Sequence, residues 1–375
     1  MTKSNHEWLE ADGLGGFASH TRGGTRTRRY HALLLVSRKP PTDRRVLVNG
    51  VDVVVESGGE RLALTSQTYA SSTDGEKSVV CHDGRPAPFD FDGSLWPRWT
   101  YDLGEGKTIE HSIMVPRGSS LVILSWRLSS PNGRAARLIV RPFLSGRDYH
   151  SLQHENPDFN FKPAAAEKPG RWVFQTYAGE PGVVAVSNGA FREEPHWYGN
   201  FLYPEERERG LDHTEDLGTP GIFAFNLNER EALLVFGTQG PTEDMNGATL
   251  EGRVAAIRAD ERTRRLGAPT PLLRAASAYI AQRGSGMTIL AGYPWFTDWG
   301  RDTFISLRGL CIAAERLREA RHVLAQWSGA VSQGMLPNRF TDSDEAPEFN
   351  SVDASLWFIV AVHDLIAAEK RSGFI

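Results

Sequence analysis

Aromatic, acidic and basic side chains gather in residues 291–308, which read AGYPWFTDWGRDTFISLR. Trp295 and Trp299 lie there close to Arg301 and Asp302, and an apolar helical pattern follows. Flat aromatic rings cover the apolar face of a pyranose, while carboxylate and guanidinium groups bind its hydroxyls. A rigid group of both types suits a sugar better than a phosphate or a nucleic acid. The spacing alone fits equally well a tryptophan-rich core turn in which Asp302 caps a helix.

A second acidic stretch, residues 334–358, forms a long connection that leads into another apolar helical pattern. Ser351 is a good helix cap, so Asp353 is expected in the first turn, where the helix dipole lowers the pKa of a carboxylate. For Asp353 to hold a proton at neutral pH, burial against Trp357 or Phe349 must outweigh that dipole. Desolvation can raise a pKa by about 3–5 units, against a dipole effect of ~1 kcal/mol, so a role as general acid stays open.

Short apolar runs with glycine and proline turns between them fill residues 1–265, and helical periodicity is almost absent there. This pattern is typical of a large antiparallel β-sandwich. Asn49 and Gly50 separate two valine-rich runs and predict a two-residue hairpin turn. The other strands are expected at residues 32–36, 62–64, 78–81, 108–115, 121–128, 136–142, 171–175, 183–187, 221–227 and 232–238.

Charged residues of this first domain are interpreted mainly as structural. The three arginines within residues 26–29 precede a buried run and are expected to form a solvated basic edge. Two long segments, residues 146–156 and 196–216, are rich in polar and aromatic side chains, which is typical of functional loops or of loops docked on another domain. Within the second segment, residues 205–209 are expected to be solvated charges.

A charged and then proline-rich linker is expected at residues 261–271, after which the apolar period changes from two to about 3.6. Residues 272–280 carry one apolar stripe, which Gly284 ends. The sequence predicts further helices at residues 303–317, 318–328 and 351–370. A helical domain therefore follows the sandwich, with the aromatic stretch at the start of its second helix.

Composition excludes several classes of protein. The chain of 375 residues has a net charge of −4 and a pI near 6.3, so it lacks the basic footprint of a nucleic-acid-binding protein. No apolar run approaches the roughly 18 residues of a membrane span, and the N-terminus lacks the apolar core of a signal peptide, which favours the cytoplasm. Cys81 and Cys311 are isolated, and the histidines of the two polar segments lack zinc-ligand spacing. We therefore expect no metal and no cofactor, and the oligomeric state stays open.

Several motifs, in this order along the chain, resemble those of bacterial glycogen debranching enzymes of the amylo-α-1,6-glucosidase type. The matching stretches are GLGGFA at 13–18, TRRYHALL at 27–34, residues 200–216, residues 291–307, LPNRF at 336–340 and NSVDASLW at 350–357. The WGRDT motif that begins at Trp299 is specific in this context, whereas the glycine-rich start alone is weak evidence.

The resemblance implies an N-terminal antiparallel β-sandwich over residues 1–265, followed by the first part of an (α/α)6 barrel over residues 266–375. It also implies hydrolysis, with inversion, of the α-1,6-linked glucose at glycogen branch points, with glycogen or a limit dextrin as the substrate. By the same resemblance, Asp353 is the general acid, Trp295 and Trp299 are walls of the glucose subsite, and Arg301, Asp302 and Asn350 bind the sugar.

The chain departs from this family at its C-terminal end and looks truncated. A full barrel of twelve helices needs well over about 200 residues, while residues 271–375 have room for about four or five helices. An inverting hydrolase also needs a second carboxylate about 6.5–9.5 Å from the acid to activate water. In this family that base lies late in the barrel, which places it beyond residue 375. We therefore expect these residues alone to be inactive and marginally folded in their second half.

Three other functions fit the same residues. One is a related hydrolase of the glucoamylase or trehalase type, and another is a non-catalytic carbohydrate-binding protein. The third is a sandwich that only scaffolds an oligomer. A transferase activity has no support, because the sequence shows no (β/α)8 pattern.

Overall fold

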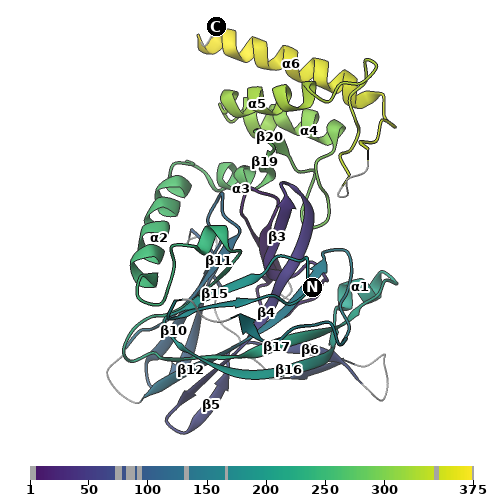
Figure 1. Cartoon of the computed structure of the whole chain (residues 1–375). Coiled ribbons are helices and arrows are strands. Elements are labelled where there is room, and N and C mark those ends of the chain that lie inside the picture. Colours follow the sequence, from purple (N-terminus) through teal and green to yellow (C-terminus); the bar gives the residue numbers. More distant parts are fainter. Residues whose placement is uncertain are drawn as a thin grey trace. The chain divides into compact units, whose positions relative to one another are not determined.

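A computed structural model describes residues 6–71, 78–81, 89–90, 95–130, 135–164, 168–341 and 346–373 of the chain (Figure 1). The chain divides into two compact units. The sandwich unit comprises the residues up to Glu10 together with Phe17–Val36 and Arg45–Thr263, and the helical unit comprises Ala11–Gly16, Ser37–Arg44 and Arg264–Ile375. Two short N-terminal segments therefore belong to the helical unit. No helix in the described ranges is long and apolar enough to cross a membrane.

Two sheets form the sandwich unit, and their facing sides enclose its main apolar core. The first sheet has the order β1 (Glu7–Ala11), β2 (Phe17–Thr21), β3 (Ala32–Lys39), β4 (Thr42–Ser57), β12 (Ala136–Asp148), β17 (Thr214–Asn226), β16 (Ala190–Leu202), β6 (Gln67–Ala70) and β7 (Ser78–Cys81), with β5 (Glu60–Ala63) paired to β4. The second has the order β13 (Pro163–Ala164), β14 (Arg171–Phe174), β15 (Val183–Ser187), β18 (Ala232–Gly237), β11 (Leu121–Leu128), β10 (Lys107–Met114), β9 (Arg98–Gly104) and β8 (Phe89–Asp90). Neighbours such as β10 and β11, or β12 and β17, pair antiparallel, which confirms the mainly antiparallel β-fold expected for this part.

The hairpin predicted at Asn49 and Gly50 is wrong. Both residues lie inside β4, which pairs with β12 through a register shift at this point. Asn49 is fully buried, and its side-chain amide donates a hydrogen bond to the Glu215 carboxylate at 3.3 Å. A Cβ atom at Gly50 would lie 3.4 Å from the His20 ring, which is an ordinary contact distance, so neither space nor backbone conformation requires a turn glycine here. A buried irregularity in a strand thus mimicked a turn signal.

Two helices of the sandwich unit were not expected. They are α1 (Pro204–Glu208) and α2 (Leu250–Leu266), and α2 includes half of the predicted linker. Most of α2 is polar, and only Leu250 and Val254 are buried in the core beneath it, with Ile257 packed beside them. So short an apolar stripe gives a weak periodic signal, which explains why the helix was missed.

Buried histidines stack against tryptophans in the sandwich core. The His111 ring lies between Trp99 and Trp126, with ring centroids 5.3 Å and 4.6 Å away, and its Nδ1 donates to the Ser125 carbonyl at 2.9 Å. Burial lowers the pKa of His111 from 6.5 to about 4. Burial likewise lowers the pKa of His20, which stacks on Trp8, to about 3. Both rings are therefore neutral at physiological pH.

The helical unit contains α3 (Pro271–Tyr279), the hairpin of β19 (Ile280–Arg283) and β20 (Gly286–Ile289), α4 (Gly300–Leu307), α5 (Leu317–Ser328) and α6 (Asp353–Ser372). Helices α4, α5 and α6 pack around a core whose largest member is the fully buried Trp327 (Figure 1). The third and fourth predicted helices are confirmed by α5 and α6. The helix predicted to reach residue 317 ends earlier, in a π-helical turn at Arg308–Ile312 and a residue of positive φ, Glu315.

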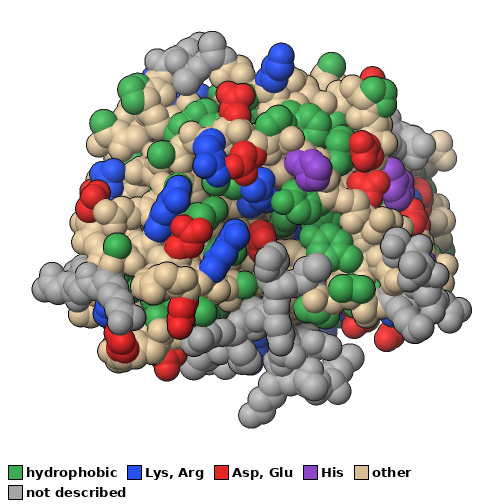
Figure 2. All heavy atoms as spheres, turned by 90° about the horizontal axis from the view of Figure 1, so that it is seen from below, with side chains coloured by type: hydrophobic (Ala, Val, Ile, Leu, Met, Phe, Trp, Pro, Cys, Tyr) green, Lys and Arg blue, Asp and Glu red, His purple; other side chains and the backbone are tan. Residues whose placement is uncertain are grey.

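One face of the molecule shows basic and acidic side chains lying next to one another (Figure 2). The ion pairs on the first sheet are of this kind, with Arg141 and Glu194 at 2.7 Å and Arg137 and Glu56 at 3.6 Å. Such partly exposed pairs contribute little to stability. They keep the surface charge mixed rather than collected into a patch of one sign.

Candidate functional site

The aromatic loop, residues 291–299, connects β20 to α4 within the helical unit. The Ala291 amide donates to the Thr297 carbonyl at 2.8 Å, and the Phe296 amide donates to the Gly292 carbonyl at 3.0 Å. The Thr303 hydroxyl, one turn into α4, donates to the Ile289 carbonyl at 3.1 Å. These bonds close the loop on itself and join its two ends, so its side chains are held on a rigid support.

Three aromatic rings follow one another along this loop. The Trp295 and Phe296 ring centroids lie 6.0 Å apart, and those of Phe296 and Trp299 lie 6.3 Å apart, with near-perpendicular planes in the second pair. Trp295 and Trp299 are half-buried, while Phe296 remains 45% exposed. The rings therefore offer an accessible apolar surface, which distinguishes the loop from the buried tryptophan-rich turn considered as an alternative.

A short ladder of β-bridges runs beside Trp299. Trp299 forms a β-bridge with Arg339, and Arg339 forms a second bridge with Glu348. The Arg339 guanidinium lies 5.4 Å from the Trp299 ring and is paired with the Glu348 carboxylate at 2.5 Å. Asn350 donates from its side-chain amide to Glu348 at 3.4 Å, which links this predicted sugar-binding residue to the wall that Trp299 forms.

Helices α4 and α6 begin side by side at this ladder. The Gly300 amide donates to the Asn338 carbonyl at 2.7 Å, and a Cβ atom at Gly300 would lie 2.6 Å from the Pro337 carbonyl oxygen. Glycine is thus required where the two segments approach each other. Arg301 follows on α4, and its Nη1 lies 3.5 Å from the carboxylate of Asp353, the first residue of α6.

The Asp353 carboxylate is accessible and ionised. Its side chain is 43% exposed, and that of Arg301 is 52% exposed. The Ser351 hydroxyl donates to the Asp353 carboxylate, and this bond, together with the charge of Arg301, lowers the pKa of Asp353. Burial against Trp357 or Phe349 therefore does not raise that pKa in the ligand-free chain.

Neither Asp302, the cap in the alternative reading of the aromatic stretch, nor Ser351, the expected cap of the last helix, is an N-cap residue. The N-cap residue of α4 is Trp299, and Asp302 lies within the first turn. The N-cap residue of α6 is Val352, whereas Ser351 lies one residue earlier and bonds to the Asp353 side chain instead of the helix backbone. Within the described ranges, the half-buried Asp302 carboxylate has no hydrogen bond or ion pair, so its oxygens can accept from a ligand.

The predicted residues thus fall into two adjoining groups, one around the Arg301–Asp353 pair and one around Trp299 and Asn350. Asp298, from the same aromatic stretch, is fully buried in a pair with Arg283 and cannot reach a ligand. Sequence reasoning missed Arg339 and Glu348. The LPNRF motif contains Arg339, but its spacing alone gave no sign that the side chain stacks on Trp299.

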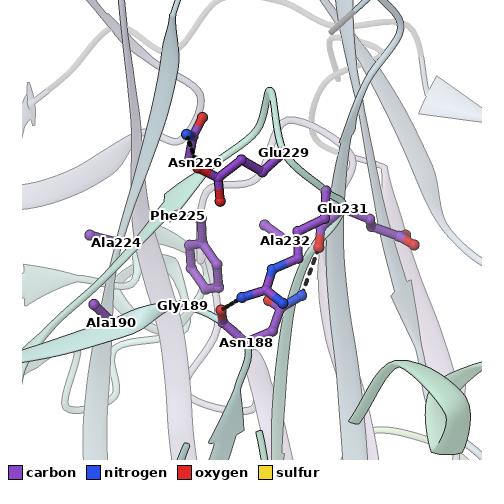
Figure 3. A pocket seen from close by; sticks show the side chains of 10 residues that line it. Asn188, Gly189, Ala190, Ala224, Phe225, Asn226, Glu229, Glu231 and Ala232 are labelled. Carbon is purple, nitrogen blue, oxygen red and sulfur yellow. Dashed lines mark hydrogen bonds between the residues drawn. The ribbon is translucent and has the colours of Figure 1, made fainter. Parts of the chain in front are cut away.

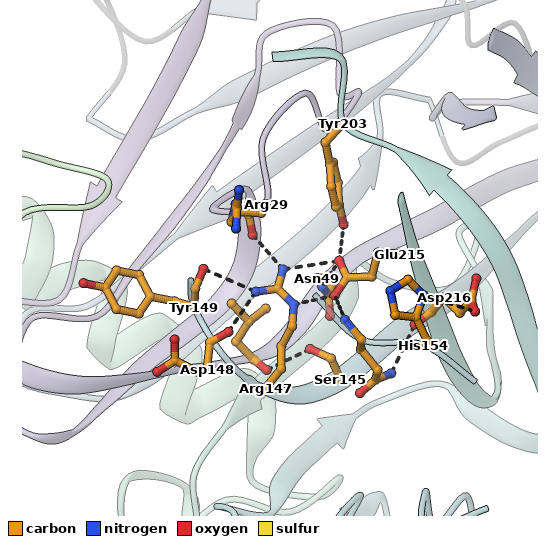
Figure 4. A network of polar contacts seen from close by, with 12 residues as sticks. Arg29, Asn49, Ser145, Arg147, Asp148, Tyr149, His154, Tyr203, Glu215 and Asp216 are labelled. Carbon is orange, nitrogen blue, oxygen red and sulfur yellow. Dashed lines mark hydrogen bonds and ion pairs between the residues drawn. The ribbon is translucent and has the colours of Figure 1, made fainter. Parts of the chain in front are cut away.

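A second polar cluster lies buried in the sandwich unit (Figure 4). Arg147 pairs with the Glu215 carboxylate, which also accepts hydrogen bonds from the Tyr203 hydroxyl and, at 3.1 Å, from the Gln153 amide. Arg147 donates further to the Arg29 carbonyl at 2.7 Å. The cluster ties the two polar segments predicted at 146–156 and 196–216 to one another, so its role is to stabilise the unit.

The basic edge predicted at residues 26–29 is likewise not solvated. Arg26 is 4% exposed, and its guanidinium lies 4.4 Å from the Phe201 ring. Arg29 pairs at 3.4 Å with Glu206, which is completely buried. The expectation that residues 205–209 are solvated charges is therefore wrong for Glu206.

A small hollow in the sandwich unit opens between the segment at Asn188 and the turn that precedes β18 (Figure 3). Its volume is about 170 Å³, below the roughly 300–1,000 Å³ of typical ligand pockets. Arg230 donates to the Asn188 carbonyl at 2.9 Å, and the Asn188 amide donates to the Glu231 carbonyl at 2.9 Å. None of the predicted site residues line this hollow, and its polar groups are engaged with each other.

Comparisons with known proteins agree with the motifs. Residues 6–234 match the family model described as "Glycogen debranching enzyme N terminal", and residues 274–375 match the one described as "Amylo-alpha-1,6-glucosidase". A segment of 85 residues is 38% identical to the glycogen debranching enzyme of Saccharomyces cerevisiae, covering 21% of this chain and 5% of the yeast protein.

A bacterial glucoamylase complexed with acarbose is similar in structure, with a TM-score of 0.48 and 12% identity, covering 97% of this chain and 54% of that chain. The chain thus spans about half of that structure, and its match spans a small part of the yeast protein. Since the N-terminal family model alone covers more than half of the residues, the chain belongs to the glycogen debranching enzyme family.

Proposed function

We propose that the helical unit carries the glucose-binding and acid-donating part of an amylo-α-1,6-glucosidase, which hydrolyses the α-1,6-linked glucose at glycogen branch points with inversion. The observation that carries this proposal is the contact between Arg301 and Asp353 beside the aromatic loop, within the segment that matches the amylo-α-1,6-glucosidase model. The substrate would be glycogen or a limit dextrin.

The proposed subsite uses each side chain for a distinct contact. Trp295 and Trp299 would cover the apolar faces of the glucose ring. Arg301 would donate to ring hydroxyls, and the Asp302 carboxylate, which has no partner in the described part of the chain, would accept from them in charge-assisted bonds. Asn350, which lies beside the ladder, would contact the sugar through its side-chain amide.

Asp353 would protonate the leaving oxygen once the sugar is bound. In the ligand-free chain its lowered pKa opposes this role, because the group is ionised at neutral pH. A sugar ring seated on the aromatic loop would displace water and draw Arg301 toward its hydroxyls. Both changes raise the pKa of a carboxylate, so proton uptake would accompany substrate binding.

The helices of this unit are proposed to be the first part of an (α/α)6 barrel, with the domain boundary near residue 265. The apolar side chains that are exposed along α6 and at its N-cap support this, since a barrel helix is covered on more than one face. The exposed fractions are 70% for Val352, 58% for Leu356, 64% for Ile359 and 42% for Ile366. Residues that recur at this helical spacing form one stripe.

The second carboxylate of the inverting reaction is proposed to come from outside these 375 residues. The chain alone would then bind glucan without releasing glucose, and its helical unit would be marginally stable. The test is incubation with a limit dextrin, with glucose measured by a coupled enzymatic assay. Sustained glucose release would overturn the proposed inactivity.

A non-catalytic carbohydrate-binding protein is the alternative, and the exposed, ionised Asp353 favours it. Binding of a limit dextrin, measured by calorimetry, separates the two functions when wild type is compared with Asp353→Asn. In the glucosidase reading Asp353 is protonated when the sugar is bound, and a neutral hydrogen bond contributes about 0.5–1.5 kcal/mol, so the variant should lose about two- to tenfold in affinity. Unchanged affinity in Asp353→Asn would favour the binding protein.

Two further variants complete this experiment. Trp299→Ala should weaken binding by about tenfold or more, because the stacking surface is removed. Asp364→Asn is the matched control, since Asp364 lies on the same helix and pairs with Arg308 at 2.6 Å outside the proposed subsite. Equal losses in Asp364→Asn and Asp353→Asn would argue against a specific role for Asp353.

A further inference from the structure

A buried ion pair lies directly behind the proposed glucose subsite. Asp298, the residue before Trp299, is completely buried, and Arg283 donates to its two carboxylate oxygens at 2.5 Å and 2.6 Å. The Thr288 hydroxyl donates to one of the same oxygens at 2.9 Å. Two parallel hydrogen bonds of this kind fix the relative orientation of the guanidinium and the carboxylate as well as the distance between them.

Arg283 contacts both segments that form the wall of the subsite. It ends strand β19, and its guanidinium also lies 4.2 Å from the centroid of the Phe340 ring. Phe340 in turn packs on Trp327 at 4.7 Å, and the Trp327 indole donates to Thr288 at 3.1 Å. The arginine is thus held between the aromatic loop, the segment after Asn338 and the core.

The pairing of these two segments explains why this contact matters. Trp299 and Arg339 face each other across an antiparallel bridge, and their neighbours Asp298 and Phe340 point to the opposite side, because successive side chains alternate along extended backbone. The outer pair forms the wall of the subsite, and the inner pair receives Arg283. One guanidinium therefore secures both halves of the bridge from behind.

We propose that Arg283 and Asp298 are positioning residues that set the orientation of the Trp299 indole and of the Arg339 side chain stacked on it. This rests on the proposed function, in which Trp299 stacks on glucose. A lysine at position 283 keeps the charge but cannot bond to both oxygens or lie flat on Phe340. Trp299 would then sample several orientations, and the stacking surface would no longer be preformed.

The experiment compares Arg283→Lys and Asp298→Asn with a matched control, Arg321→Lys. Arg321 also pairs with a buried carboxylate, that of Glu369, at 2.6 Å, but between α5 and α6. Two quantities are measured well below the unfolding temperature. One is the affinity for a limit dextrin by calorimetry, and the other is the indole N–H signal of Trp299 in protein labelled with nitrogen-15 at tryptophan.

We expect Arg283→Lys and Asp298→Asn to lose about tenfold in affinity, corresponding to roughly 1.4 kcal/mol, and to shift or broaden the Trp299 signal. Arg321→Lys should lower the unfolding temperature yet leave the affinity within about twofold and the signal in place. Unchanged affinity and an unchanged Trp299 signal in a folded Arg283→Lys protein would refute the proposal. Equal changes in affinity and in the Trp299 signal in Arg321→Lys would also refute it, because they would indicate general destabilisation.

Failure of this proposal can be distinguished both from misfolding of a variant and from failure of the proposed function. If Arg283→Lys does not fold, Asp298→Asn, which has nearly the same shape as the native residue, decides the question. If wild type itself binds no glucan, the proposed function fails, whereas the Trp299 signal still reports whether Arg283 positions the indole.

Discussion

Two arginine–carboxylate pairs in this chain consist of the same chemical groups in opposite surroundings. In the sandwich unit, the side chains of Arg147 and Glu215 are 5% and 0% exposed. In the helical unit, those of Arg301 and Asp353 are 52% and 43% exposed and 3.5 Å apart. The Glu215 oxygens accept several further hydrogen bonds, whereas Asp353 has Ser351 and Arg301 as its partners.

The difference teaches how to tell a stabilising cluster from a binding one. A buried pair whose lone pairs and protons are all used has nothing left to offer a ligand, and breaking it leaves a charge without solvent. An exposed pair contributes little to stability, so its groups are free to exchange partners when a sugar arrives. Both pairs consist of a guanidinium and a carboxylate, and burial decides the role.

The largest effect is expected from a substitution that breaks the buried pair of Arg147 and Glu215. Glu215→Ala leaves Arg147 charged and without its partner, which should lower the free energy of unfolding by about 3–5 kcal/mol. Urea unfolding followed by tryptophan fluorescence measures this loss. Glu56→Ala is the control, because Glu56 forms an exposed pair with Arg137 and should cost less than about 1 kcal/mol. Similar losses in both variants would show that burial does not separate these pairs.

The second largest effect is a difference between the two units in how their stability depends on pH. Burial holds the pKa of His20 at about 3 and that of His111 at about 4, below the ordinary 6.5, so the unfolded chain takes up protons first as the pH falls. The contribution of each neutral buried ring to the free energy of unfolding is complete above about pH 6.5. About 2 kcal/mol of it per ring is lost by pH 5. The histidines of the helical unit, His322 and His363, are exposed.

Hydrogen exchange between pH 7 and pH 5 measures this difference. Protection should fall in the strands that contain His20 and His111, with a smaller change in α5 and α6. His111→Phe, which keeps a planar ring without a titrating group, should reduce the pH dependence. Loss of protection in both units to the same extent would contradict the prediction.

The smallest effect concerns the exposed pair. Ser351→Ala removes the hydroxyl that donates to Asp353, so the pKa of Asp353 should rise toward its ordinary value while stability stays nearly unchanged. A carboxyl-detected NMR titration measures this pKa. Ser328→Ala, which removes an exposed hydroxyl of α5, is the control. An unaltered pKa in Ser351→Ala would mean that Arg301 alone sets it.

Much of this architecture was predictable because local patterns carry it. Strand β10 shows alternation, β11 is a nearly continuous apolar run, and helices α5 and α6 have apolar residues at the helical period; Asp353 lies in the first turn expected for it. Predictions failed where a distant residue overrode a local signal. Gly50 reads as a turn but lies in a strand beside His20, and Arg26 reads as a surface charge but stacks on Phe201.

The sequence by itself determined the family, the order of a β-rich part and a helical part, and the short stretches from which a sugar subsite could be assembled. Only the tertiary structure decided which charged residues are available to a ligand. Asp298 and Asp302 are four residues apart and chemically identical, yet Asp298 is buried in a pair with Arg283, whereas Asp302 at the start of α4 has no side-chain partner among the described residues. That distinction depends on solvent exposure and on partners distant in the chain, which no local pattern encodes.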